Sequence, residues 1–235
     1  MTACWQERIA IPGAAGLLAG ELAYPTGAPR AAVLLLNPHP LMGGRMDNNV
    51  IAHVAEALAA AGTVTLRFDY RGVGRSNGPA VDVPAAMAEF WAHGRTPHDP
   101  LMIDDGRAAL LWLRRSVRLP LFVIGYSFGA HVGAHIMPAD ARGIILITPT
   151  LTHHDFAPAE HTPFNALVVV GQSDFATPLE HTMHWARSLP GSTSVRVLSG
   201  GGHFFRGIEP RVADACLSFI ESTLTSMEPA SCTPA

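Results

Sequence analysis

The sequence predicts an α/β fold in which a mostly parallel sheet of about eight strands carries helices on both faces. Three observations support this prediction. Short apolar runs alternate with segments of helical periodicity from residue 31 onward, which is typical of βαβ units. One apolar run leads directly into the sequence Gly-Tyr-Ser-Phe-Gly. An aspartate and a histidine then follow later strands, in an order that is typical of chains with this motif.

The strands are predicted from buried apolar runs, and the helices from apolar positions that recur every three to four residues. The expected strands of the alternating part are residues 32–36, 63–68, 121–124, 144–147, 166–170 and 195–198. The expected helices are residues 49–61, 104–115, 130–135, 178–189 and 211–224, with Asp47 or Asn48 capping the first and aspartates of its own capping the second.

The amino-terminal segment permits two interpretations. Arg8 precedes a mostly apolar stretch over residues 9–20, which is loosely similar to a signal peptide. Pro12, Gly13 and Gly16 would break a helix there, so we expect two antiparallel strands joined by a turn at residues 13–16. Residues 1–224 are expected to form a single domain, and residues 225–235 a flexible tail.

The composition excludes several classes of function. Hydrophobic residues make up 48% and charged residues 15% of the 235 residues, as in a well-packed globular chain. A net charge of −3 provides no basic surface for nucleic acid, and no lysine is present for a Schiff base or a P-loop. No apolar run is long enough to span a membrane. Three widely spaced cysteines, Cys4, Cys216 and Cys232, indicate a reducing cytoplasm.

Ser127 is the predicted nucleophile. It lies in the sequence Gly125-Tyr126-Ser127-Phe128-Gly129, between an expected strand and an expected helix. In this context the motif forms a sharp turn that holds the serine in a strained conformation at the top of the sheet. The glycines are expected because a side chain on either flank would clash with the neighbouring strand or helix.

A serine hydroxyl needs a base to remove its proton, and the base needs an acid to orient it. His203 is the predicted base, because a glycine-rich loop after the last strand would bring its imidazole over the end of the sheet. Asp174 is the predicted acid, just beyond the strand 166–170. Asp155 is a minor rival for this role, since it also lies beyond the end of a strand.

The loop after the first alternating strand, residues 37–44, is expected to supply part of an oxyanion hole. Pro38 and Pro40 have no N–H to donate, which leaves His39, Leu41 or Met42. Similarity to related oxyanion loops, in which the residue after the His-Pro pair faces the nucleophile, selects the Leu41 N–H. The second predicted donor is the Phe128 N–H, directly after the nucleophile at the start of a helix.

These motifs resemble the α/β-hydrolase superfamily over nearly the whole chain, and an α/β-hydrolase fold is therefore expected. Within it, the chain is similar to small bacterial serine hydrolases related to esterases and dienelactone hydrolases. Their His-Pro-x-x-x-Gly-Gly loop followed by Asp-Asn has a shorter counterpart in residues 39–48, HPLMGGRMDN. Their Phe-Asp-x-Arg-Gly-x-Gly-x-Ser loop matches residues 68–76, and their Gly-His-Phe-Phe segment matches residues 202–205.

Two segments interrupt the alternation, residues 77–100 and residues 149–163, and both follow the carboxyl end of a strand. They are candidate lids, with ordinary surface loops as the alternative. A short helix is expected in the first, with Pro84, Met87, Ala88 and Trp91 on one side. The predicted substrate-pocket residues are His39, Met87, Phe90 and Trp91.

No metal or cofactor is expected. His131 and His135 have a spacing that could bind a metal, but no third ligand accompanies them, so a structural role is preferred. Asp69 and Arg71 are expected to pair with each other within their loop.

The sequence thus predicts a cofactor-independent serine hydrolase that cleaves a small or medium-sized carboxylic ester or thioester through an acyl-enzyme. Three alternatives remain open: an acyltransferase, a lyase or cyclase that uses the same residues, and a non-catalytic ligand-binding protein. The expected partner is a small acyl substrate, and a homodimer is possible.

Overall fold

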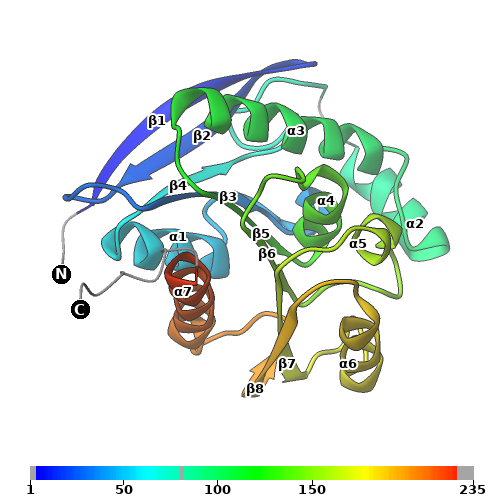
Figure 1. Ribbon diagram of the computed structural model, residues 1–235. Helices are drawn as coiled ribbons and strands as arrows, with labels where there is room; N and C mark the ends of the chain where they lie inside the picture. Colours follow the sequence, from blue (N-terminus) through cyan, green and yellow to red (C-terminus); the bar gives the residue numbers. More distant parts are fainter. Residues whose placement is uncertain (1–3, 80–81, 227–235) are drawn as a thin grey trace, which may run out of the picture.

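The structure is a computed structural model that describes residues 4–79 and 82–226. Its centre is an eight-stranded sheet with the strand order β1-β2-β4-β3-β5-β6-β7-β8 (Figure 1). Strands β3 to β8 run parallel to one another, and β1 and β2 form an antiparallel edge next to β4. The predicted fold class is therefore confirmed.

The elements follow one another in the alternation that the sequence predicts. The strands are β1 (Trp5–Gly13), β2 (Gly16–Tyr24), β3 (Ala31–Leu36), β4 (Thr63–Phe68), β5 (Leu121–Tyr126), β6 (Gly143–Ile147), β7 (Ala166–Ser173) and β8 (Thr193–Gly202). The helices are η1 (Pro40–Met42), α1 (Asn49–Ala60), α2 (Val83–His93), α3 (Asp99–Ser116), α4 (Phe128–Ile136), α5 (Ala157–His161), α6 (Leu179–Ser188) and α7 (Glu209–Thr225).

Two helical layers cover the sheet, and each encloses its own apolar core (Figure 1). Helices α3 to α6 pack on one face, and α1 and α7 pack on the other. The central strands β3 and β5 are buried at every position, because both faces of a parallel sheet are covered in this architecture. The carboxyl ends of β3, β5, β7 and β8 lead into the loops that carry the predicted site residues.

The amino-terminal hairpin is confirmed. Gly13 pairs with Gly16 at the end of a continuous antiparallel ladder, and Gly16 has a φ of 112°, which only glycine adopts without strain. Asn48 caps α1 by accepting hydrogen bonds from the Val50 and Ile51 N–H groups, as predicted.

Three local predictions are wrong. Helix α3 starts at Asp99, five residues before the predicted start, and the aspartates at 104 and 105 lie inside it. Strand β8 continues to Gly202, so the segment before His203 is strand and not a glycine-rich loop. Arg71 does not pair with Asp69. Its guanidinium instead binds both carboxylate oxygens of Asp105, at 2.6 to 3.0 Å, while Asp69 accepts the Met46 N–H at 2.8 Å.

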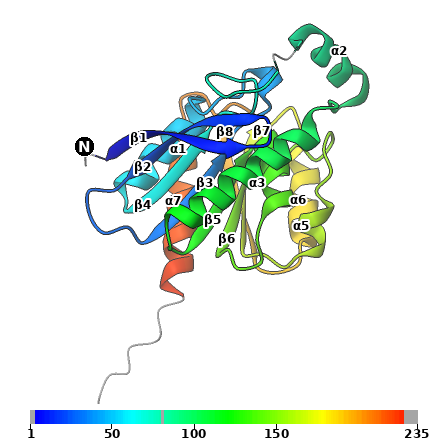
Figure 2. The same cartoon turned by 90° about the horizontal axis from the view of Figure 1, so that it is seen from above.

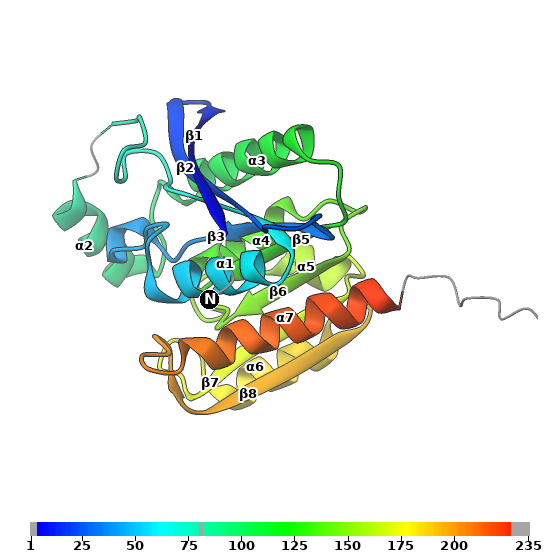
Figure 3. The same ribbon diagram turned by 90° about the vertical axis from the view of Figure 1, so that its left-hand side faces the viewer.

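Helix α2 lies apart from the two helical layers, beyond the ends of the strands (Figures 2 and 3). It occupies the first candidate lid, and Asp82 caps it by accepting the Ala85 N–H at 3.1 Å. Its buried residues are Ala86 and Phe90, whereas Trp91, on the side that the sequence singled out, is 74% exposed.

No helix in the part of the chain that the structure describes is both long and apolar enough to cross a membrane. The end of the predicted tail, from residue 227, lies outside the described residues.

Candidate active site

Ser127 stands at the junction of β5 and α4, as the motif predicts. Its φ of 56° lies in the left-handed region, where a non-glycine residue is strained. The Ser127 N–H donates to the Ile147 carbonyl at 2.8 Å, which ties the turn to the end of β6. The structure therefore contains the sharp strand-to-helix turn of a nucleophile elbow.

The two flanking glycines are required by close backbone contacts. A Cβ atom on Gly125 would lie 2.6 Å from the Cα of Ala130, in the first turn of α4. A Cβ atom on Gly129 would lie 2.7 Å from the carbonyl oxygen of Asn37, in the loop after β3. Both distances are shorter than real Cβ contacts, so the predicted reason for the glycines is confirmed.

The structure brings Ser127, His203 and Asp174 into one hydrogen-bonded chain. His203 Nε2 lies 3.0 Å from Ser127 Oγ, and His203 Nδ1 lies 3.0 and 3.2 Å from the two carboxylate oxygens of Asp174. The Asp174 side chain is only 1% exposed. A buried carboxylate accepts the Nδ1–H of the imidazole, which leaves Nε2 free to accept the serine proton.

The backbone around His203 and Asp174 is held by packing at the ends of β7 and β8. Tyr126 donates from its hydroxyl to the His203 carbonyl at 2.8 Å, and Asp174 accepts the Ala176 N–H at 2.8 Å. The ladder between β7 and β8 shifts register at residues 171–173. There Gly171 faces the Gly201 carbonyl so closely that a Cβ would lie 2.6 Å from it. The irregular strand ends thus place Asp174 against His203, and His203 against Ser127.

Asp155, the rival for the role of the acid, makes its hydrogen bonds away from His203. Its carboxylate accepts the N–H of Ala157, the first residue of α5, at 2.8 Å, and its carbonyl accepts a hydrogen bond from His131 Nδ1 at 2.7 Å. His131 and His135 lie with their ring centroids 4.3 Å apart. Among residues 4–79 and 82–226, no three His, Cys, Asp or Glu side chains are arranged to hold a metal ion.

The first turn of α4 presents one predicted oxyanion donor. Phe128 is the first residue of α4, where backbone N–H groups have no partner within the helix. No hydrogen bond from the Phe128 N–H is found among the described residues. This amide and the positive end of the helix dipole lie directly beside Ser127.

The loop after β3 uses most of its N–H groups internally. The Leu41 N–H donates to His39 Nδ1 at 3.2 Å, and those of Met42 and Gly44 donate to the His39 carbonyl at 3.0 and 3.1 Å. The Gly43 N–H donates to the Pro40 carbonyl at 3.0 Å. The occupied Leu41 N–H argues against the donor that we selected from the sequence. The His39 N–H, one of the three original candidates, makes no hydrogen bond to a described residue.

A comparison with known families agrees with this geometry. The family model described as "Serine aminopeptidase, S33" matches residues 27–180, which is more than half of the chain. The chain belongs to the S33 family of α/β hydrolases.

Similar proteins have been found in several bacteria. An α/β serine hydrolase homologue from Coxiella burnetii is 26% identical, with a TM-score of 0.73 over 94% of this chain and 97% of its own. XC6422 from Xanthomonas campestris, described as an α/β serine hydrolase without a lid, is 24% identical, with a TM-score of 0.79 over 97% of both chains. The uncharacterized protein RP471 from Rickettsia prowazekii is 25% identical over 83% of this chain and 80% of its own.

The predicted pocket residues of this S33 hydrolase have different environments. His39 is buried behind the loop, with its ring centroid 4.5 Å from that of Phe128. Phe90 is buried and stacks on His153, with ring centroids 5.6 Å apart and planes 13° apart. This contact joins the two candidate lids. Met87 is half-buried, and Trp91 is exposed.

An aromatic rim beside the histidine was missed in the sequence analysis. Phe175 and Phe204 have their ring centroids 5.0 and 5.6 Å from that of His203, and 5.5 Å from each other. They are 72% and 50% exposed, which is unusual for large apolar side chains. The two phenylalanines directly after His203 in the sequence could have indicated the Phe204 part of this rim.

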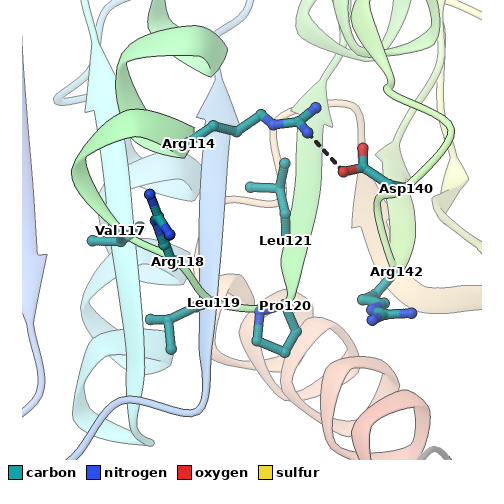
Figure 4. Close-up of a pocket in the computed structure, with 8 residues that line it drawn as sticks. All are labelled: Arg114, Val117, Arg118, Leu119, Pro120, Leu121, Asp140 and Arg142. Carbon is teal, nitrogen blue, oxygen red and sulfur yellow. Dashed lines mark hydrogen bonds and ion pairs between the residues drawn. The ribbon is translucent and has the colours of Figure 1, made fainter.

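A hollow of about 390 Å3 in this S33 hydrolase lies far from the site, where Arg114 forms an ion pair with Asp140 (Figure 4). It borders Leu121, at the first residue of β5, whereas Ser127 follows the last residue of the same strand. The hollow is therefore at the opposite end of the sheet and cannot receive an acyl group bound to Ser127.

Proposed function

We propose that this S33 hydrolase cleaves carboxylic esters or thioesters through an acyl-enzyme on Ser127. The observation that carries the proposal is the continuous hydrogen-bonded chain from Asp174 through His203 to Ser127. No further ligand is needed to complete a nucleophile, a base and an orienting acid.

The reaction follows from the positions of these atoms. Ser127 Oγ attacks the acyl carbonyl while His203 Nε2 takes its proton, and Asp174 stabilises the imidazolium that forms. The imidazolium then gives the proton to the departing alcohol or thiol. Water, activated by the same imidazole, attacks the acyl-enzyme and releases the acid.

The oxyanion is held by backbone N–H groups. The Phe128 N–H is one donor, and the His39 N–H replaces Leu41 as the second donor in this proposal. The support for His39 is that the other N–H groups from Leu41 to Gly44 are already engaged within the loop. Two aligned amides in a dry site would stabilise the charge that develops on the carbonyl oxygen.

The aromatic rim beside His203 is the evidence for an apolar leaving group. The leaving group must lie next to the imidazole that protonates it, and Phe175 and Phe204 flank that imidazole. Exposed aromatic rings at this position offer apolar contact area to an alkyl or aryl alcohol or thiol. The acyl group would then lie on the other side of Ser127, towards α2.

The cytoplasm is the proposed location. The thiols of Cys4 and Cys216 are both free, which supports a reducing compartment, while Cys232 lies outside the described residues.

The test is covalent labelling together with a substrate panel. A fluorophosphonate should modify Ser127 in the folded protein, and Ser127→Ala should abolish both labelling and turnover. Ser218→Ala, at an exposed serine of α7, is the matched control and should change neither. A panel of p-nitrophenyl esters, thioesters and an aminoacyl p-nitroanilide separates esterase from aminopeptidase activity.

An adduct on another residue would refute the nucleophile assignment. Labelling of Ser127 without turnover of any ester or thioester would refute the proposed substrate class. Product formed only when an added alcohol or amine accepts the acyl group would instead establish an acyltransferase.

A further inference from the structure

A second Asp–His pair lies behind the oxyanion loop. His39 Nε2 lies 3.1 Å from Asp99 Oδ1, and both side chains are buried. The other ring nitrogen, His39 Nδ1, accepts the Leu41 N–H at 3.2 Å. The order of the groups is that of Asp174, His203 and Ser127, but the two ring nitrogens exchange roles and a backbone N–H takes the place of the serine hydroxyl. None of the motifs in the sequence indicates this pair, because 60 residues separate its members.

From this geometry we infer that Asp99 is a positioning residue, which sets the tautomer of His39 and thereby the conformation of the oxyanion loop. The inference rests on the proposed function, since it concerns the loop that would hold the oxyanion. Asp99 lies at the start of α3, where residues 77–100 end. The first candidate lid therefore joins the catalytic machinery at its carboxyl end.

The carboxylate of Asp99 is held so that it can only accept from His39. The Thr96 N–H donates to Asp99 Oδ2 at 3.2 Å, and the Thr96 hydroxyl donates to Oδ1 at 2.6 Å. Burial raises the pKa of Asp99, but the hydrogen bonds from His39 and Thr96 outweigh burial and hold it below its ordinary value. An ionised Asp99 requires a proton on His39 Nε2, and a neutral imidazole then has a lone pair on Nδ1.

That lone pair holds the turn at the start of η1. His39 is the N-cap of η1, and its Nδ1 accepts the N–H of the residue two positions on, as an Asn or Asp side chain does in an Asx-turn. The turn engages the Leu41 N–H and leaves the His39 N–H without a partner among the described residues. If the proton moved to Nδ1, two N–H donors would face each other and the turn would open.

The surroundings of the pair contain further titratable and aromatic groups. His154 Nε2 is buried, has no hydrogen-bond partner in the described part of the chain, and lies 3.7 Å from Asp99 Oδ2. The rings of Phe90 and Phe128 lie on the other sides of His39, with centroids 6.1 and 4.5 Å away. His39 is thus enclosed by α2, α4 and the segment before α5, and cannot turn its ring without moving them.

The decisive variant is Asp99→Asn, which is nearly equal in size. The Thr96 N–H can only donate, so the amide oxygen must occupy the Oδ2 position. The amide NH2 then faces the Thr96 hydroxyl, which can accept, and His39 Nε2, which must also accept. Asp99→Asn therefore favours the Nδ1–H tautomer of His39 and opposes the Leu41 N–H.

We expect Asp99→Asn to lower kcat about 10- to 100-fold with little change in KM, since a displaced oxyanion donor affects the transition state more than the substrate. The matched control is Asp104→Asn, on the exposed side of the same helix, where Asp104 forms an ion pair with Arg107 at 2.9 Å. It should have less than a twofold effect. A phosphonate transition-state analogue should lose affinity for the Asp99→Asn variant by the same factor as kcat/KM.

A second experiment repeats the Asp99→Asn substitution in a His39→Asn background. An asparagine oxygen can accept the Leu41 N–H without any tautomer to control. In that background, Asp99→Asn should lower kcat less than twofold. Equal losses in both backgrounds would overturn the proposal, because Asp99 would then act without His39. A rise in KM with unchanged kcat would also overturn it.

The 15N spectrum of the imidazole groups tests the pair without any substrate. His39 should carry its proton on Nε2 in the wild-type protein and on Nδ1 in the Asp99→Asn variant. An unchanged tautomer would refute the inference even if the wild-type protein proved to be an esterase. The expected change of tautomer in a protein that hydrolyses no ester would refute the proposed function alone.

Discussion

Replacing His131 by glutamine should remove a large part of the acid sensitivity of the folded state. His131 lies in α4 behind Phe128, and its Nδ1–H donates to the Asp155 carbonyl. Burial, and the neighbouring His135 as a lesser cause, lower the pKa of His131 from 6.5 to about 4. The folded protein thus keeps this imidazole neutral at pH values where the unfolded chain protonates it.

The sign and size of the effect follow from proton linkage. Between about pH 6.5 and pH 4 the unfolded state binds one more proton at this site, so the free energy of unfolding falls as the pH falls. With a pKa of 6.5 unfolded and about 4 folded, the loss between pH 7 and pH 5 is about 2 kcal/mol. His154, whose pKa burial and then the nearby His131 lower to about 3, contributes a similar loss of about 2 kcal/mol.

The assay is urea unfolding at pH 7 and pH 5, followed by tryptophan fluorescence. His131→Gln keeps a side-chain donor for the Asp155 carbonyl but removes the titration. Between pH 7 and pH 5, the free energy of unfolding of this variant should fall by about 2 kcal/mol less than that of the wild-type protein. His181→Gln, at an exposed position of α6, should behave as the wild type. Equal losses for wild type and His131→Gln would refute the reasoning.

Three further predictions concern the elbow, the acid and the lid. Asp174→Asn should lower kcat by about 10⁴-fold through the wrong histidine tautomer, whereas Asp155→Asn should change kcat only a few-fold; the reverse order in steady-state assays would reassign the acid. Gly129→Ala places a Cβ 2.7 Å from a backbone oxygen and should lower the free energy of unfolding by about 1–3 kcal/mol or more, and an unchanged melting temperature would contradict the close packing. Trp91→Ala should alter the ranking of acyl-chain lengths without lowering the melting temperature, while Phe90→Ala, at a buried position, should lower it; the opposite pattern would place Trp91 in the core.

Features that depend on neighbouring residues were predictable from the sequence. The turn at Gly13–Gly16 needs a glycine with positive φ, and the hairpin forms where it was predicted. The elbow at Ser127 combines an apolar run, two glycines and a helical segment, all within residues 121–135. The order of Ser127, Asp174 and His203 along the strands was sufficient to predict that they meet, because parallel strands bring their carboxyl ends to one edge.

Features that depend on packing between distant elements were not predictable. Arg71 has Asp69 two residues away, yet it binds Asp105, because α3 brings that buried carboxylate within reach and its oxygens need a partner. The periodicity of α2 is compatible with burying either side, and the contacts of Phe90 with His153 and His39 decide that it faces inward.

The sequence by itself thus determined the order of the elements, the sharp turn and the residues that could act as nucleophile, base and acid. Local backbone preference and hydrophobic periodicity encode these properties directly. Only the tertiary structure decided which N–H of the loop after β3 makes no hydrogen bond to a described residue. Asp99, which contacts His39, lies 60 residues from it along the chain, and the packing of α3 on the sheet brings the two side chains together. A hydrogen bond between such distant groups depends on the packing of the elements between them, which local sequence patterns do not specify.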